Sequence, residues 1–194
     1  MKLSADLIAD SPPEWIKAVM DDFDSFLLDH ADCERKASSM AMSFVAKYPN
    51  RVEIIPELIE TAVEELEHFQ QVYAIMEERG LRLPDSMGQD LYVKQLLKSC
   101  RTGREERFMD RMLWASVIEC RGAERFRLVY EALPPGELKK FYHALWASEA
   151  KHGHIFVKMT LNYFDEASVE KRLHELVAIE SETLMGLEIR PALH

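Results

Sequence analysis

The chain is 194 residues long with 47% apolar and 30% charged residues, a balance typical of one globular domain with its own core. Seven glycines and eight prolines exclude a collagen-like or Pro/Gly-rich disordered chain, and no apolar run approaches the roughly 20 residues that a membrane span needs. The net charge of −10 argues against a protein coated all over in nucleic acid and is compatible with a local basic patch.

Helical periodicity dominates the chain from residue 21 onward. Apolar residues recur three and four positions apart, and no segment shows the sustained alternation of a strand. Tyr48-Pro49-Asn50, Arg79-Gly80 and Pro134-Pro135-Gly136 interrupt the pattern as turn and stop signals. The sequence predicts four long helices, over about 21–47, 53–78, 105–132 and 137–163, with further helices over about 90–99 and from Asp165, a possible cap, to near Gly186.

The four long helices form two pairs. Short connections join 21–47 to 53–78 and 105–132 to 137–163, so each pair is expected to be an antiparallel hairpin. The segment 80–104 crosses from one hairpin to the other, which is the connectivity of ferritin-like bundles. We therefore predict an all-α, ferritin-like four-helix bundle with additional shorter helices, forming a single domain over 1–194.

Two Glu-x-x-His pairs occupy matching places in the two hairpins. Glu65-x-x-His68 and Glu149-x-x-His152 each lie in the second helix of a hairpin, where residues three apart share a face. Glu34 precedes Glu65 by 31 residues and Glu119 precedes Glu149 by 30, so each first helix places a glutamate level with the pair. This pattern is the ligand set of di-iron or di-manganese carboxylate bundles. The predicted metal ligands are Glu34, Glu65, His68, Glu119, Glu149 and His152.

The surroundings of the two single glutamates favour a buried site. Ala31 and Ala37 lie one turn from Glu34, and Ala115 and Ala123 lie one turn from Glu119, which leaves space for ions and for a reactant. Four carboxylates balance two dications in charge, whereas unpaired buried carboxylates would be costly. Oxygen-rich sites that include imidazole suit iron or manganese better than soft thiophilic metals, so two ions of either metal are expected at this point.

A basic stripe lies between residues 90 and 130. The segment has nine basic and six acidic residues, so it is +3 within a chain of −10. One interpretation is a solvated face whose cations pair with Glu105, Glu106 and Asp110. The other is a patch that follows a phosphate backbone beside the metal site.

Four segments give the sequence a family resemblance. DHADCERKASSMA (29–41), EELEHFQQV (64–72), SVIECRGAERF (116–126) and ASEAKHGHIF (147–156) resemble the tRNA 2-methylthio-isopentenyladenosine hydroxylases, the MiaE family. The resemblance extends over about residues 10–165. It implies the same six metal ligands that the spacing indicates, with no further catalytic residue.

The resemblance also implies an activity. The expected enzyme is a non-haem di-iron monooxygenase that uses O2 and two electrons from a ferredoxin or reductase to hydroxylate the isopentenyl group of the modified adenosine in the tRNA anticodon loop. With tRNA as the partner, Lys98, Arg101 and Arg104 are expected to hold anticodon-stem phosphates. The three cysteines form no Cys-x-x-Cys pair, and the N-terminus lacks a signal-peptide pattern, so a cytoplasmic protein without membrane attachment is expected.

Two alternatives remain open from the sequence. The same bundle could host another di-metal oxidoreductase, such as a peroxidase, a manganese catalase or a ferroxidase. The chain could also be a metal-free helical interaction module, in which the spacing of the six residues has no functional meaning. This alternative predicts that no metal binds.

Overall fold

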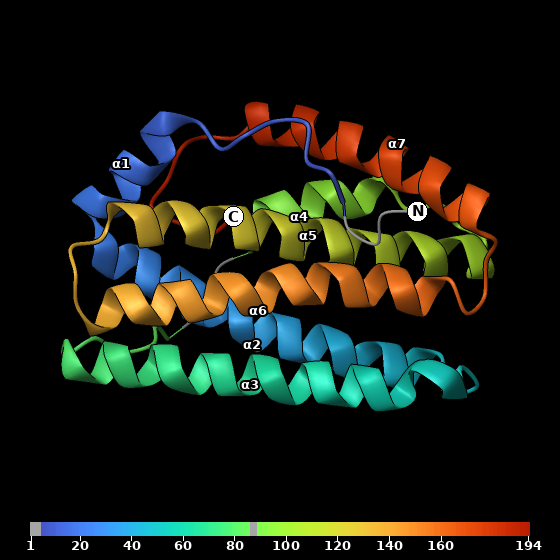
Figure 1. The fold of residues 1–194 in the computed structure, drawn as a ribbon, viewed down its shortest axis with the longest axis horizontal. Coiled ribbons are helices and arrows are strands. Elements are labelled where there is room, and N and C mark those ends of the chain that lie inside the picture. Colours follow the sequence, from blue (N-terminus) through green and yellow to red (C-terminus); the bar gives the residue numbers. More distant parts are fainter. Residues whose placement is uncertain (1–4, 86–88) are drawn as a thin grey trace. The chain divides into compact units, whose positions relative to one another are not determined.

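Helices are the regular structure of this computed structural model, which describes residues 5–85 and 89–194. The described chain divides into two compact units, and Figure 1 shows the helices of each. The first hairpin unit contains residues 17–85 and 190–193, and the second hairpin unit contains residues 5–16, 89–189 and 194. The all-α prediction is confirmed, whereas the assignment of residues 1–194 to a single domain stays a prediction.

The first hairpin unit is built from α2 (Phe23–Lys47) and α3 (Ile55–Glu78), which pack side by side (Figure 1). A 3-10 turn over Val52–Ile54 leads into α3. The predicted stop after α3 is present: Gly80 has a φ of +72°, and Leu81 N donates to Met76 O at 2.9 Å. This is a Schellman ending, in which glycine takes the left-handed conformation at low cost.

The sequence did not predict α1 (Pro13–Asp21) as a separate helix. The predicted first helix began at residue 21, but Asp22 separates α1 from α2. The Asp22 carboxylate accepts a hydrogen bond from Ser25 N at 3.1 Å, so this residue caps α2. The cap explains why α2 begins at Phe23.

The second hairpin unit is built around α5 (Arg104–Ala132) and α6 (Glu137–Thr160). Two more helices, α4 (Leu91–Leu96) and α7 (Glu166–Met185), belong to the same unit, and a 3-10 turn over Leu97–Ser99 follows α4. Asp165 caps α7 as expected, accepting from Ser168 N at 2.9 Å. Side chains from all four helices form one apolar cluster, which includes Leu96, Leu113, Val157 and Leu176.

A buried polar network fastens α7 to α5. The Arg121 guanidinium on α5 donates to Glu180 on α7 at 2.9 and 3.1 Å, to Glu124 at 3.0 Å and to the Ala9 carbonyl at 2.7 Å. Tyr92 donates to Glu180 at 2.8 Å, and burial together with the Glu180 charge raises the pKa of the Tyr92 hydroxyl well above its usual range. The side of α5 that faces α7 is therefore buried within this unit.

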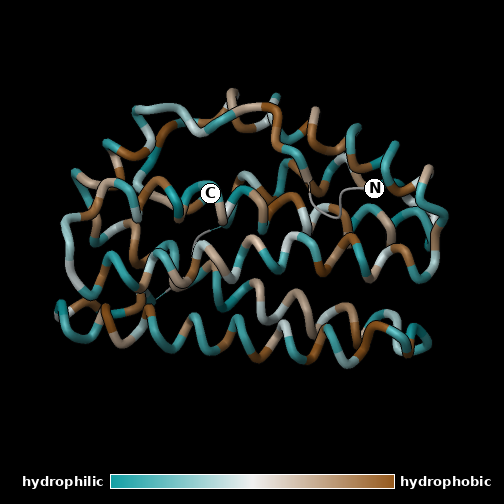
Figure 2. The backbone as a smooth tube through the Cα atoms, in the orientation of Figure 1, coloured by the Kyte–Doolittle hydropathy of each residue, from teal (hydrophilic) through white to brown (hydrophobic). Residues whose placement is uncertain are grey.

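Apolar and polar segments follow one another along the turns of each helix, as the colours of Figure 2 show. This recurrence is typical of amphipathic helices. Within the described residues, no helix combines the length and the hydropathy that crossing a membrane requires. The apolar side chains instead supply the buried core of each unit.

Candidate metal centre

The first hairpin unit brings three predicted ligands together. Glu34 projects from α2, and Glu65 and His68 project from neighbouring positions of α3; their exposed fractions are 3%, 1% and 9%. His68 Nδ1 lies 3.4 Å from Glu65 Oε2 and 3.7 Å from Glu34 Oε2. One ligand atom from each residue lies within 4.8 Å of the other two. We call this set the first triad.

The second hairpin unit repeats the arrangement. Glu119 projects from α5, and Glu149 and His152 project from α6; all three side chains are buried. His152 Nδ1 lies 3.4 Å from Glu149 Oε2, and Glu119 supplies an oxygen within 4.8 Å of ligand atoms of both. This set is the second triad.

Serine hydroxyls join the two helices of each hairpin near the ligands. In the first hairpin unit, Ser38 Oγ on α2 donates to the Ala62 carbonyl on α3 at 2.7 Å. In the second, Ser116 Oγ on α5 donates to the Gly153 carbonyl on α6 at 2.7 Å. These bonds fix the register in which each single glutamate faces its Glu-x-x-His pair.

Gly153 allows α6 to approach α5 closely. A Cβ atom at this position would lie 2.6 Å from Cys120 Sγ and 3.6 Å from the Ser116 carbonyl oxygen. Cys120 directly follows Glu119, and Gly153 directly follows His152. The glycine therefore sets the helix separation at the level of two predicted ligands.

His30 belongs to the site, and the sequence analysis missed it. His30 is fully buried on α2, one turn before Glu34, and its Nε2 lies 2.6 Å from Glu34 Oε1. An ionised carboxylate only accepts hydrogen bonds, so the imidazole donates and holds Glu34 in place. The i, i+4 spacing of His30 and Glu34 was the signal in the sequence that could have revealed this contact.

The donor set of each triad fits a divalent metal ion. Each triad offers carboxylate oxygens and one imidazole, the ligands that suit iron or manganese. Two ionised carboxylates per triad balance the charge of one dication, which offsets the cost of burying them. The imidazole of His30 is of the kind that orients a ligand from behind.

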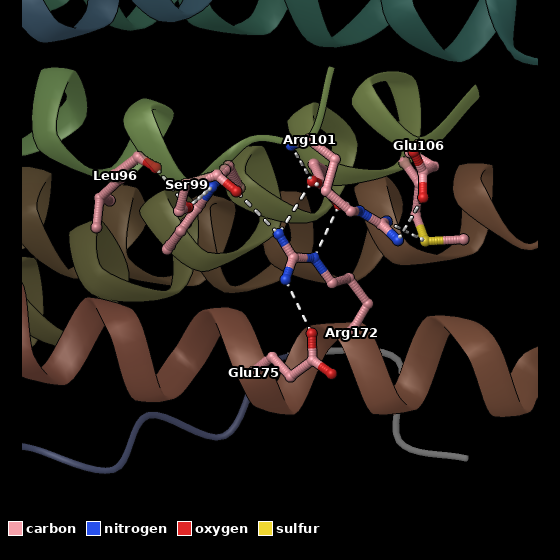
Figure 3. A network of polar contacts seen from close by, with 9 residues as sticks. Leu96, Ser99, Arg101, Glu106, Arg172 and Glu175 are labelled. Carbon is pink, nitrogen blue, oxygen red and sulfur yellow. Dashed lines mark hydrogen bonds and ion pairs between the residues drawn. The ribbon is translucent and has the colours of Figure 1, made fainter. Parts of the chain in front are cut away.

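The three cations predicted to hold tRNA phosphates have different surroundings. The side chains of Lys98 and Arg104 are exposed and form no ion pair or hydrogen bond with the other described residues. Arg101 instead donates to Asp110 through its backbone nitrogen at 2.8 Å and through its guanidinium at 2.7 Å, and its Nη1 lies 3.5 Å from Glu106 (Figure 3). The side chain of Arg101 thus anchors the turn before α5. This contact agrees with the interpretation in which the cations of the basic stripe pair with nearby carboxylates.

Asp110 is the centre of this polar network. Its fully buried carboxylate also accepts from Arg172 on α7 at 2.9 and 3.0 Å (Figure 3). Burial favours the protonated acid, but the hydrogen bonds from Arg101 and Arg172 outweigh it and lower the pKa of the Asp110 carboxyl. The network ties α7 to the start of α5.

Comparison with known proteins adds a family and a fold. A family model described as tRNA-(MS2IO6A)-hydroxylase (MiaE) matches residues 2–194. A tRNA 2-(methylsulfanyl)-N(6)-isopentenyladenosine(37) hydroxylase from Pseudomonas putida is 35% identical over 186 residues, which are 95% of this chain and 89% of that protein. A protein of the same name from Salmonella typhimurium is 26% identical over 134 residues, 69% of this chain and 48% of its own length.

A solved structure resembles the fold. It is a protein from Synechococcus with aldehyde deformylating oxygenase activity, with a TM-score of 0.89 and 32% sequence identity. The match covers 95% of this chain and 92% of that one. The predicted ferritin-like fold is confirmed by this likeness together with the helical structure.

Proposed function

We propose that this chain, which belongs to the MiaE family of tRNA hydroxylases, hydroxylates the isopentenyl group of 2-methylthio-isopentenyladenosine in tRNA. Family membership makes the chain an oxidoreductase and bears out the resemblance found in the sequence. The observation that carries the proposal is the pair of buried triads, Glu34 with Glu65 and His68, and Glu119 with Glu149 and His152. We propose further that the enzyme acts in the cytoplasm, on the tRNA found there.

We propose that the two triads combine into one centre that binds two iron ions, with manganese as the alternative metal. The equal donor sets, the burial of all six side chains and the ferritin-like fold support this arrangement. When bound, the metal centre supplies the activation of O2. The reaction balances as RH + O2 + 2 e− + 2 H+ → ROH + H2O, where RH is the isopentenyl C–H, so a ferredoxin or reductase must provide two electrons.

The residues of the chain hold and orient the reactants. His30 keeps Glu34 aligned, and Ser116 and Gly153 keep Glu119 opposite its partners on α6. The modified base lies in a single-stranded loop, so it can be turned out of the stack and inserted as a unit. We propose that Lys98 and Arg104, together with the part-exposed guanidinium of Arg101, hold the phosphates of the anticodon stem.

A single-turnover assay tests this function. The protein is loaded with iron without oxygen, reduced chemically, and mixed with O2 and a tRNA that carries the methylthio-isopentenyl base. The RNA is digested, and the nucleosides are weighed by mass spectrometry. Gain of one oxygen atom with the wild type, lost in Glu119→Ala, is the expected result. Iron binding without a mass change would remove the tRNA assignment.

The Synechococcus likeness favours a second candidate, a ferritin-like oxygenase acting on small aldehydes. Offering these compounds and hydrogen peroxide to the same iron-loaded protein distinguishes it from the tRNA hydroxylase. Conversion of a small substrate at a rate unaffected by tRNA would favour this candidate.

A further inference from the structure

The outer face of α3 carries a row of exposed apolar side chains. Ile59, Val63, Leu66 and Tyr73 are 45%, 50%, 54% and 36% exposed. Their spacing of four, three and seven residues places them on one face of the helix. Val63, Leu66, Phe69 and Tyr73 also line a shallow groove of about 510 Å³. Exposed apolar side chains gathered beside a groove make this surface a candidate interaction site.

The same helix is acidic in its first half and at its C-terminal end. It contains seven glutamates, at positions 57, 60, 64, 65, 67, 77 and 78, and no lysine or arginine. Glu60 and Glu67 are exposed and lie close in sequence to Val63 and Leu66. We call this surface, with its apolar row and the exposed Glu60 and Glu67, the acidic face of α3.

Charge decides which partner fits the acidic face. RNA phosphates would be repelled, so tRNA does not dock here. Two copies of the face would set glutamates against glutamates, which disfavours a symmetric dimer through this helix. A protein with an apolar contact area surrounded by lysine and arginine would gain from both features, burial of the apolar row and attraction to the glutamates.

The acidic face lies close to two of the proposed metal ligands, which suggests what such a partner does. Glu65 and His68 lie on the buried side of α3, whereas Leu66 and Glu67 lie on its exposed side. The two sides are separated by one helix, whose full diameter is about 10–12 Å. A redox protein on the acidic face would therefore place its cofactor one helix away from two proposed iron ligands.

We propose that the acidic face of α3 is the docking site for the electron-donor protein, an iron–sulfur or flavin protein with a basic rim around its redox centre. This inference rests on the proposed function, which requires such a donor. The donor gives up two electrons in total for each O2 consumed. These electrons, with two protons and one oxygen atom, form water, while the other oxygen atom enters the isopentenyl C–H bond, which supplies the remaining two electrons. A small, charge-steered contact of this type suits a transient electron-transfer complex.

The test compares a reaction that needs the donor with one that does not. The double variant Glu60→Lys/Glu67→Lys reverses charge on the acidic face, and Leu66→Ser removes its most exposed apolar side chain. The matched control Glu170→Lys/Glu182→Lys makes the same charge change at exposed positions of α7. Each variant replaces the wild type in cells that lack the gene, and the hydroxylated nucleoside in their tRNA is quantified by mass spectrometry. The purified variants are also assayed in single turnover with dithionite as reductant.

The expected result is a loss of at least about tenfold in hydroxylation in cells for both α3 variants, with dithionite-driven turnover and melting temperature unchanged. The control keeps both activities. Full hydroxylation in cells by the α3 variants overturns the inference, and so does equal loss in both assays. Absence of product from the wild type with dithionite would instead defeat the proposed function.

A photo-cross-linker at position 66 gives a readout that is independent of activity. The expected product joins α3 to a redox protein through a lysine- or arginine-rich peptide, and it is missing when the cross-linker is placed at position 170. A product that joins two copies of this chain, or that contains a protein without a redox cofactor, overturns the inference.

Discussion

The two hairpin units present the same ligand pattern but cover their helices differently. In the second unit, α4 and α7 bury the apolar side chains of α5, and Arg121 and Asp110 fasten α7 by buried polar contacts. In the first unit, the outer face of α3 leaves apolar side chains exposed between glutamates. Two hairpins with the same ligand pattern can thus differ in their outer surfaces. One is covered by further helices of the chain, and the other leaves apolar side chains exposed for a partner.

The two triads also differ in what holds their single glutamate. Glu34 forms a hydrogen bond with His30. The corresponding position in the second hairpin, four residues before Glu119, is Ala115, which has no polar side-chain atom. Conversely, the close helix approach at Gly153 occurs in the second hairpin. The two halves reach similar ligand geometry by different means.

The largest expected effect comes from removing one ligand from either triad. Glu34→Ala or Glu119→Ala should weaken metal binding by about 100-fold or more, beyond the 10–100-fold typical for outer partners, because a direct ligand is lost. Iron per chain after dialysis measures this, with Glu170→Ala as control. Loss of one iron in each variant would show independent halves, and loss of both would show a shared centre. Retention of the full iron content in both variants would remove these residues as ligands.

A second effect is confined to the Asp110 network of the second unit. Asp110→Asn should cost about 3–5 kcal/mol, because it leaves two arginines around a neutral side chain in a buried site. Unfolding by urea at neutral pH measures the loss, and the control Asp165→Asn, at an exposed N-cap where asparagine caps about as well as aspartate, should cost much less. An equal cost in both variants would contradict the importance of burial.

The pH dependence follows from the lowered pKa of the Asp110 carboxyl. A lowered folded pKa means that the stabilisation is present above the unfolded value of about 3.9 and is lost as the pH falls toward the folded value. Wild-type stability should therefore decrease with acid in that window, and Asp110→Asn should flatten the decrease. Identical slopes for both proteins would show that Asp110 does not titrate as its contacts indicate.

The helices and the faces that carry the six proposed ligands were predictable, because they follow from helix geometry and from the helix-breaking residues. Residues three apart share a face, and the breaks at Tyr48-Pro49-Asn50 and Pro134-Pro135-Gly136 fix the hairpins, so Glu65 and His68 had to lie together. Whether the two triads meet in one centre stays a prediction.

What the sequence analysis missed depends on burial and on single contacts. The break between α1 and α2 depends on one cap at Asp22, and a lone acid is too common a signal to locate a boundary. Arg101 looked equivalent to Lys98 and Arg104 because sequence spacing does not reveal that Asp110 is buried among arginines. The exposed row on α3 resembles a core stripe in the sequence, and only the structure distinguishes the two.

A smaller effect is expected where α6 approaches α5. Gly153→Ala would put a Cβ 2.6 Å from Cys120 Sγ, so the cysteine must rotate or the helices must separate, at about 1–3 kcal/mol. The double variant Gly153→Ala/Cys120→Ala removes the sulfur and should recover most of this stability, as a double-mutant cycle would measure. No coupling between the two substitutions would mean that another contact limits the helix approach.

His30 offers the finest distinction between the two triads. His30→Ala removes the hydrogen bond to Glu34 and should weaken iron binding by about tenfold, the lower end for a residue that orients a ligand. His30→Gln retains an amide donor and should recover part of the affinity, whereas His174→Ala, at an exposed site on α7, should change nothing. Titration with ferrous iron under nitrogen, followed by spectroscopy of the bound metal, separates the two halves. If the altered signal belongs to only one of two bound ions, the imidazole positions the first triad alone, and the second triad, with Ala115 at the matching place, is held by packing.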